Sequence, residues 1–288
     1  GDSGANLSLT GSAAHRKEAG LRFWVEAFLV VGVYVGYSMV RNLFGSVAVT
    51  PGLAANNADR IISIEKAMGL FLEADLQKAF IDATIFIQFW NLFYGVFHFL
   101  VTFGALVWLY LRFPGDYRFW RRAGLIGTAS AVAGFAAFPL MPPRLLGDCG
   151  KYGACRPGEP FVDTVIEIGG IWSFESAGLE TISNQYAAMP SLHIAWALWC
   201  ALILVPRLRS VPARLLAASY PLLTLFAIVV TANHYWIDGV GGIAVMGFGY
   251  GASRLYERVT TTTGVTPNPM AFDSGADDFG TSVGIGVT

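Results

Sequence analysis

The chain has 288 residues, of which 54% are hydrophobic and only 14% are charged, and its formal net charge is −1. With a mean hydropathy of +0.52, it carries more apolar surface than one soluble core of this length normally buries. The composition therefore argues against a pair of soluble domains, which the length alone would permit.

The apolar residues come in long blocks rather than in amphipathic stripes. A hydrocarbon core takes about 20 mostly apolar residues per helical crossing, and six segments approach this length: Leu21–Phe44, Ala83–Leu111, Ala123–Met141, Pro190–Val205, Leu215–Ala232 and Gly239–Tyr256. We therefore expect an all-α, polytopic membrane protein whose six transmembrane helices form a bundle over residues 21–258. Residues 1–20 and 259–288 lack periodicity, which predicts disordered cytoplasmic ends.

Lys and Arg in the short connections predict the orientation of the helices, because cytoplasmic loops carry an excess of both. Twelve of the 19 basic residues fall on one side of the six-helix arrangement: Arg16, Lys17, Arg22, Arg112, Arg118, Arg121, Arg122, Arg207, Arg209, Arg214, Arg254 and Arg258. On the other side, acidic residues outnumber basic ones. The first side is therefore predicted to be cytoplasmic and the second extracytoplasmic.

Residues 56–82, between the first two predicted helices, combine apolar and charged side chains at roughly helical spacing. Such a segment predicts a helix that lies along the outer membrane interface, with its apolar face toward the acyl chains. Packing of the same face against the bundle is the alternative, and the pattern leaves both open.

Two histidines and an aspartate stand at the ends of apolar segments. MPSLH opens the fourth predicted helix and NHYWID follows the fifth, so His193 and His234 are 41 residues apart in the sequence. Because one helix leaves the outer face and the next returns to it, both histidines are expected at the same depth. Asp238 follows His234 by four residues, within reach of its imidazole in a helical turn. A carboxylate on one ring nitrogen fixes the tautomer and leaves the other nitrogen free to react.

The second predicted helix places Asn91, Tyr94 and His98 on one face, at offsets of three and four residues. We expect this face to look into the bundle, because lipid would leave several polar groups unsatisfied. Two interpretations remain open. These side chains bind a substrate, or they form an interhelical hydrogen-bond cluster that holds the bundle together.

MPSLH followed by NHYWID resembles the second and third signatures of the type 2 phosphatidic acid phosphatase superfamily. The resemblance implies a bundle of six helices with these signatures at the outer helix ends, and an enzyme that needs no metal and no other cofactor. It also implies that His234 is the nucleophile on phosphorus, that Asp238 orients it and that His193 protonates the leaving oxygen.

The first signature of that superfamily, a lysine followed after six residues by Arg-Pro, is incomplete here. PPRLL supplies Arg144, but Ala137 stands at the lysine position, and Ile228 stands where the third signature has an arginine. Arg144 is therefore expected to hold the phosphate with help from Ser191 and from backbone N–H groups at the start of the fourth helix. Four polar residues of the outer loop are further candidates for substrate binding: Lys151, Arg156, Asn184 and Gln185.

PSLH, the reduced set of cations and the PPR sequence resemble the branch that includes fungal inositol phosphorylceramide synthase and related bacterial membrane proteins. This resemblance implies transfer of a phosphorylated head group from a phospholipid to a lipid or sugar alcohol, on the outer face of a bacterial plasma membrane. Membrane lipids are the expected partners, and nucleic acid is not. Hydrolysis of a lipid or polyprenyl phosphate by the same residues is the close alternative.

Two hypotheses of other classes remain. In the first, His98, His193, His234 and Asp238 bind zinc, although their spacing matches no common zinc motif. In the second, the chain binds or transports lipids and retains the site but catalyses no reaction. The absence of two cations of the family signatures is consistent with this hypothesis.

Cys149 and Cys155 lie six residues apart in the predicted outer loop, close to Arg144. An extracytoplasmic environment permits a disulfide, which would stiffen the segment that presents the arginine. Two free thiols are the alternative, and the sequence leaves both open.

Overall fold

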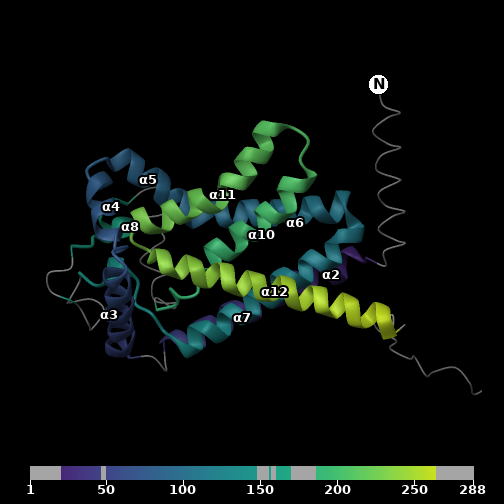
Figure 1. Cartoon of the computed structure of the whole chain (residues 1–288), viewed down its shortest axis with the longest axis horizontal. Helices are drawn as coiled ribbons and strands as arrows, with labels where there is room; N and C mark the ends of the chain where they lie inside the picture. Colours follow the sequence, from purple (N-terminus) through teal and green to yellow (C-terminus); the bar gives the residue numbers. More distant parts are fainter. Residues whose placement is uncertain (1–20, 47–49, 148–155, 157–159, 170–185, 264–288) are drawn as a thin grey trace, which may run out of the picture. The chain divides into compact units, whose positions relative to one another are not determined.

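The computed structural model describes residues 21–46, 50–147, 156, 160–169 and 186–263 (Figure 1). Within these ranges the regular structure is helical, and the only β-type pairing is an isolated bridge between Leu140 and Ala187. The predicted all-α class is thus confirmed. The chain divides into two compact units, residues 1–254 and residues 255–288, and every candidate site residue belongs to the first.

Each of the six predicted hydrophobic segments coincides with helical structure. The helices are α2 (Phe23–Ser46), α5 (Thr84–Leu92) with η1 (Phe93–Phe97) and α6 (His98–Arg112), α7 (Pro114–Ala137), α10 (Leu192–Arg207), α11 (Val211–Val230) and α12 (Trp236–Thr263). Among the helices of the described residues, two are long and apolar enough to cross a membrane, Thr84–Arg112 and Val211–Val230. Phe23–Gly32 and Leu192–Arg207 are shorter apolar helices. Six crossings therefore stay a prediction.

The helix from Thr84 to Arg112 is interrupted by a turn of π-helix at Phe93–Phe97. A π turn adds one residue to the helical repeat and is frequent at functional sites. Tyr94 lies within this turn and His98 directly follows it. The turn therefore sets the direction in which the polar face of this helix points.

Residues 56–82 do not form the single interfacial helix that the spacing predicted. They contribute to two helices, α3 (Pro51–Ala67) and α4 (Glu73–Phe80). Gly69 ends α3 at a φ of +67°, where its N–H bonds to the carbonyl of Lys66 and the N–H of Leu70 bonds to that of Glu65. This pair of hydrogen bonds is a Schellman motif, which glycine favours because it has no Cβ. The turn brings two glutamates on neighbouring helices close together.

The buried face of α3 packs on the chain segments that hold the candidate site residues. The hydrophobic cluster around it includes Ala54, Ala58, Ile61, Leu140, Met141, Leu145, Leu146 and Tyr235. Leu145 belongs to η2 (Pro143–Leu145), a 3₁₀ turn, and Tyr235 immediately follows His234. Helix α3 thus packs against the protein, and its position relative to a membrane stays a prediction.

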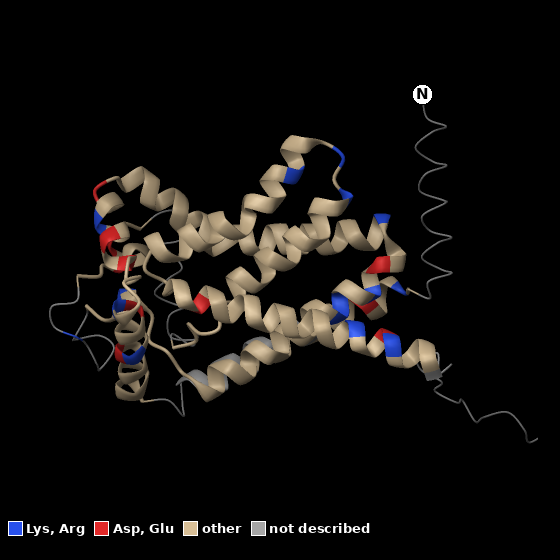
Figure 2. Cartoon of the chain, viewed as in Figure 1, with Lys and Arg blue, Asp and Glu red and all other residues tan. Residues whose placement is uncertain are grey.

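A larger cluster joins α5, α6, α7, α10 and α11, with Trp90, Leu109, Trp120, Trp199 and Ile203 among its members. Charged side chains are sparse along the middle of the helices and gather toward their ends (Figure 2). At these ends, several basic residues of the predicted cytoplasmic side form side-chain contacts between two helices. Arg121 on α7 pairs with Glu26 on α2, Arg207 on α10 bonds to Asp116 on α7 at 2.6 Å, and Arg122 on α7 bonds to Ser253 on α12 at 3.0 Å.

Candidate active site

The turn between α11 and α12 holds His234 by its main chain. The carbonyl of Ile228 accepts hydrogen bonds from the backbone N–H groups of Asn233 (2.9 Å) and His234 (3.1 Å). Ala232 adopts a φ of +54°, and the Asn233 side chain bonds to the Thr231 hydroxyl at 2.9 Å. The position where the family signature has an arginine, Ile228, is here a fully buried apolar residue whose carbonyl organises the turn.

Asp238 binds His234 and caps helix α12 with the same oxygen. Its Oδ2 lies 3.1 Å from Nδ1 of His234 and accepts the backbone N–H of Tyr235, also at 3.1 Å. The second contact is the reciprocal half of a capping box, in which a carboxylate in the first turn satisfies an otherwise orphan N–H. His234 is 4% exposed and Asp238 is fully buried. The carboxylate therefore keeps Nδ1 engaged and leaves Nε2 for chemistry.

His193 meets this pair from the start of α10. The Ser191 N–H donates to the carbonyl of Asp238 at 2.9 Å, and the rings of His193 and His234 lie 5.4 Å apart, centroid to centroid, at 68°. His193 is partly exposed while His234 is buried. The two motifs that are distant in the sequence thus share one site.

Glycines after Asp238 let α12 approach α10 closely. A Cβ on Gly242 would lie 2.3 Å from the Ser191 carbonyl oxygen, and a Cβ on Gly241 would lie 3.0 Å from the Pro190 side chain. Side chains at these positions would push apart the two segments that carry the histidines. The sequence GVGG at residues 239–242 is therefore a site of close packing between α10 and α12.

Tyr94 and His98 bring the π-helical turn into the site. The Tyr94 ring stacks on His193 at 4.5 Å and lies 6.4 Å from the His234 ring. The His98 ring lies 4.4 Å from His193, and its Nδ1 is 2.8 Å from the Tyr94 carbonyl oxygen. Three histidines and a tyrosine therefore form one aromatic cluster.

Asn91, the third member of the predicted polar face, has structural partners. It is buried, donates to the Thr164 carbonyl at 3.0 Å and accepts the Thr164 hydroxyl at 2.9 Å. Thr164 begins α8 (Thr164–Glu167), for which the Asp163 side chain is the N-cap. Asn91 thereby fixes a short helix beside the site.

Arg144 approaches the site from η2. Its N–H donates to the carbonyl of Ala232 at 2.9 Å, two residues before His234. Its guanidinium forms an ion pair with Asp163, and its buried Nε has no partner among the described residues. The hydroxyl of Ser191 is likewise buried and unpartnered there. Both groups can donate a hydrogen bond to an anion.

Arg156 is bound elsewhere, to side chains of helix α3. Its Nε contacts both carboxylate oxygens of Asp59, at 2.7 and 2.8 Å, and its Nη2 contacts Asn56 at 2.9 Å. The hydrogen bonds with Asp59 raise the pKa of the guanidinium further. Lys151, Asn184, Gln185, Cys149 and Cys155 lie outside the described residues.

Sequence reasoning missed Asp163 and Thr164, which connect Arg144 and Asn91 to the rest of the site. Asp163 is one of several acidic residues in the outer loop, where acids outnumber basic residues. An Asp-Thr pair before an apolar residue is an N-cap signal, but a helix of four residues is too short for periodicity to mark it. Among the described residues, no three His, Cys, Asp or Glu side chains are arranged to hold one metal ion.

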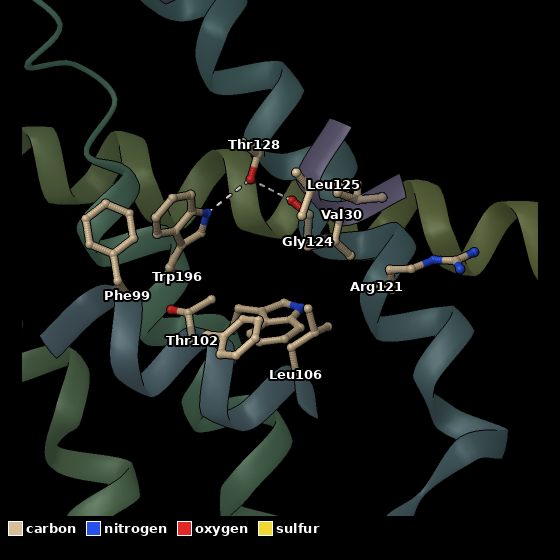
Figure 3. A pocket seen from close by; sticks show the side chains of 12 residues that line it. Val30, Phe99, Thr102, Leu106, Arg121, Gly124, Leu125, Thr128 and Trp196 are labelled. Atoms are coloured by element: carbon tan, nitrogen blue, oxygen red, sulfur yellow. Dashed lines mark hydrogen bonds between the residues drawn. The ribbon is translucent and has the colours of Figure 1, made fainter. Parts of the chain in front are cut away.

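An apolar cavity of about 380 Å³ lies between four helices (Figure 3). It is bordered by α2, α6, α7 and α10, with Phe99 and Trp196 at one end and Arg121 at the other. Trp196 bonds to the Thr128 hydroxyl at 3.0 Å, and its ring lies 5.9 Å from His98. The wall of the cavity is thus shared with the candidate site.

In a comparison with protein-family models, residues 59–252 match the PAP2 superfamily. No curated protein and no solved structure matches the chain. The matched range includes Arg144, both motif histidines and Asp238. The match extends over more than half of the chain, and the chain therefore belongs to the PAP2 superfamily, a membership that indicates phosphatase or phosphotransferase activity.

Proposed function

We propose that the protein is an integral membrane lipid phosphotransferase that moves a phosphorylated head group between lipids through a phosphohistidine on His234. The observation that carries the proposal is the contact of His234 Nδ1 with a fully buried Asp238 at 3.1 Å, with the His193 ring 5.4 Å from the His234 ring. A nucleophile, an orienting carboxylate and a second imidazole are the parts that covalent catalysis on phosphorus needs.

In the first step, the free Nε2 of His234 attacks phosphorus and an N–P bond forms. The bond from phosphorus to the leaving lipid alcohol breaks, and His193, in its protonated form, gives its proton to the departing oxygen. His234 gains positive charge in this step, and the Asp238 carboxylate stabilises it through Nδ1–H. The partial exposure of His193 suits a group that must meet both leaving and entering alcohols.

In the second step, the hydroxyl of an acceptor loses its proton to His193 and attacks phosphorus, which breaks the N–P bond. With a lipid or sugar alcohol the result is transfer, and with water it is hydrolysis. The same residues serve both reactions, so a lipid or polyprenyl phosphate phosphatase is the alternative. The resemblance to the inositol phosphorylceramide synthase branch favours transfer.

Developing charge on the phosphoryl oxygens needs nearby donors. The unpartnered Nε of Arg144 and hydroxyl of Ser191 support a role for these two residues in holding the phosphate. Arg144 approaches the site already paired with Asp163, which fixes the direction of its guanidinium. In this proposal Tyr94 and His98 border the head-group site, while Asn91 holds helix α8 next to it through Thr164.

The shared wall between the histidine cluster and the apolar cavity supports a lipid as the substrate. We propose that the acyl or polyprenyl chain of the donor lies in this cavity, with its phosphate at His234. The lining is almost entirely apolar, and burial of each CH₂ group contributes about 0.8 kcal/mol. A chain of this kind would orient the phosphorus relative to the nucleophile.

The test is a product assay with purified protein in lipid vesicles, using radiolabelled phospholipids and polyprenyl phosphates with and without alcohol acceptors. Wild type and His234→Ala run side by side. A new phospholipid made only by wild type supports transfer and identifies both substrates. Free phosphate without dependence on an acceptor supports hydrolysis instead. If neither protein turns over any lipid but both bind phospholipid, the protein is a binder or transporter.

Trapping of the intermediate separates the phosphohistidine from a metal-dependent route. Acid quenching destroys a phosphohistidine, whereas alkaline quenching preserves it, so label retained on wild type under alkaline conditions and absent from His234→Ala supports the covalent step. Loss of activity with a chelator, restored by zinc, would instead support the metalloenzyme.

A further inference from the structure

Two buried glutamates lie behind the His234–Asp238 pair, on helices that the proposed mechanism does not use. Glu65 is near the end of α3 and Glu73 begins α4, and both side chains are fully buried. Buried carboxylates are rare unless paired with a cation or with hydrogen-bond donors. The hydrogen-bond partners of these two glutamates therefore indicate their role.

Each glutamate accepts a backbone N–H from the first turn of α12. Glu73 Oε1 accepts from Trp236 at 3.0 Å, and Glu65 Oε1 accepts from Ile237 at 3.3 Å. These N–H groups have no partner within the helix, because the first turn of any α-helix leaves its donors free. Asp238 takes the N–H of Tyr235, so three carboxyl groups together cap this helix.

One oxygen of each carboxyl group has no donor among the described residues. Oε2 of Glu65 and Oε2 of Glu73 are buried and contact no donor among the described residues, yet the two side chains are within hydrogen-bond reach of one another. Two facing carboxylates repel, whereas one proton between them turns repulsion into a hydrogen bond. The burial of two neighbouring carboxyl groups, each with an oxygen that no donor reaches, therefore favours a proton on the pair.

The charges around the two glutamates also favour a proton on the pair. Two ionisable groups face Glu65, namely Glu73 on α4 and Asp238 on α12. Burial, followed by the charge of Glu73, raises the pKa of Glu65 to about 9, and burial also raises the pKa of Glu73. Both shifts favour a protonated carboxyl in the pair at neutral pH.

We propose that Glu65 and Glu73 are positioning residues, which share one proton and hold the first turn of α12 so that Asp238 keeps His234 in its reactive orientation. The inference rests on the proposed function, since it assigns a supporting role for the same site. The shared proton also removes one negative charge from the neighbourhood of an incoming phosphate.

Substitutions separate positioning from general stability. Glu65→Gln keeps an oxygen for the Ile237 N–H and offers an amide N–H to Glu73, so it imitates the protonated acid and should keep the transfer rate within about twofold of wild type. Glu65→Ala removes the cap and lets the turn shift. We expect kcat to fall by about tenfold to a hundredfold, as small misplacements of reacting groups do, with little change in KM. Glu73→Ala and Glu73→Gln should behave in the same way.

A direct readout does not depend on turnover. A protonated carboxylic acid has its own carbonyl stretching band in the infrared spectrum, which ionised carboxylates and amides lack. At neutral pH this band should be present in wild type, absent in Glu65→Gln, and unchanged in the matched control Asp75→Asn, which alters an exposed acid on the same helix α4. Thermal unfolding of every variant in detergent shows that the fold is intact.

Several outcomes would overturn the inference. If the band is unaffected by both Gln substitutions, no proton is shared. If well-folded Glu65→Ala keeps the wild-type kcat, the pair does not position the site, and if the Gln variants lose as much activity as the Ala variants, the negative charge rather than the proton matters. If wild type turns over no lipid while the band behaves as expected, the shared proton stands, and the proposed function and the positioning role that rests on it both fail.

Discussion

The backbone N–H of Ser191 donates to the backbone carbonyl of Asp238 at 2.9 Å. This hydrogen bond joins the start of α10 to the first turn of α12, and it therefore fixes the distance between His193 and His234 without using either side chain. Asp238 contributes to the site in three ways: its carbonyl holds Ser191, and one carboxylate oxygen engages both His234 and the N–H of Tyr235.

Asp238→Asn should separate the catalytic role of this carboxylate from its capping role. The amide keeps a similar shape and an oxygen for one N–H, but it cannot carry the charge that stabilises a cationic His234. We expect kcat to fall by about 10²- to 10⁴-fold, the range that follows loss of an orienting carboxylate in a comparable triad. The measurement is the burst of enzyme-bound label and the steady-state rate, with lipid binding retained. Full activity in this variant would refute the orienting role.

The sequence predicted the all-α class, the positions of the six apolar helices and the convergence of the two motifs. These features depend on long apolar segments and on the order in which they follow one another, and both can be read directly from the sequence. The contact between His193 and His234 followed from two helices that reverse direction, and their ring distance of 5.4 Å agrees with that expectation.

Other features depend on contacts that no local pattern records. The spacing of residues 56–82 suited one long helix, but Gly69 ends α3 in a left-handed conformation. Glu65 and Glu73 are two of the charged residues in this segment, and the spacing gave no sign that both would be buried. No pattern in the sequence indicated that Arg144 pairs with Asp163, because Asp163 lies in a loop without a periodic pattern.

Arg144→Ala should be far more damaging than Arg156→Ala. Arg144 has a buried, unpartnered Nε, and its backbone is bonded to the turn before His234, whereas Arg156 is bound to Asp59 on α3. Because the family's other cations are absent, we expect loss of Arg144 to lower kcat/KM by about a hundredfold or more, and loss of Arg156 to change it less than about threefold. The steady-state rate with a saturable donor lipid is the measurement. The reverse order would move the phosphate site toward Arg156.

Leu106→Trp should change the preference for lipid chain length. Leu106 lines the apolar cavity, so a larger side chain there removes room for a long chain but not for a short one. We expect kcat/KM to fall for long-chain donors by about tenfold and to be nearly unchanged for short-chain donors. Leu100→Trp on the same helix, at a position that is 64% exposed, is the control and should affect neither. Equal effects on both chain lengths would contradict the assignment of the cavity.

Glu65 predicts how the stability of the protein depends on pH. Its pKa is raised from 4.5 to about 9 in the folded chain, so between these values the folded state holds a proton that the unfolded state has lost. Since the folded state binds more protons, stability falls as pH rises through this window, by at most about 1.4 kcal/mol per pH unit from this group. Glu65→Gln should flatten the fall, as measured by thermal unfolding in detergent from pH 5 to pH 9. An unchanged slope would show that Glu65 ionises normally.

Gly242→Ala tests how closely α10 and α12 must approach for activity. A Cβ there would lie 2.3 Å from the Ser191 carbonyl oxygen, which is too short for any real contact, so the helices must shift and the bond between Ser191 and Asp238 must lengthen. We expect a large loss of activity and a lower melting temperature. Gly247→Ala on the same helix is the matched control, because a Cβ there meets nothing within 4 Å. That variant should be neutral or more stable by up to about 1 kcal/mol, the helix propensity of alanine over glycine. If both variants keep wild-type activity, the close approach of the two helices is not what sets the geometry of the histidines.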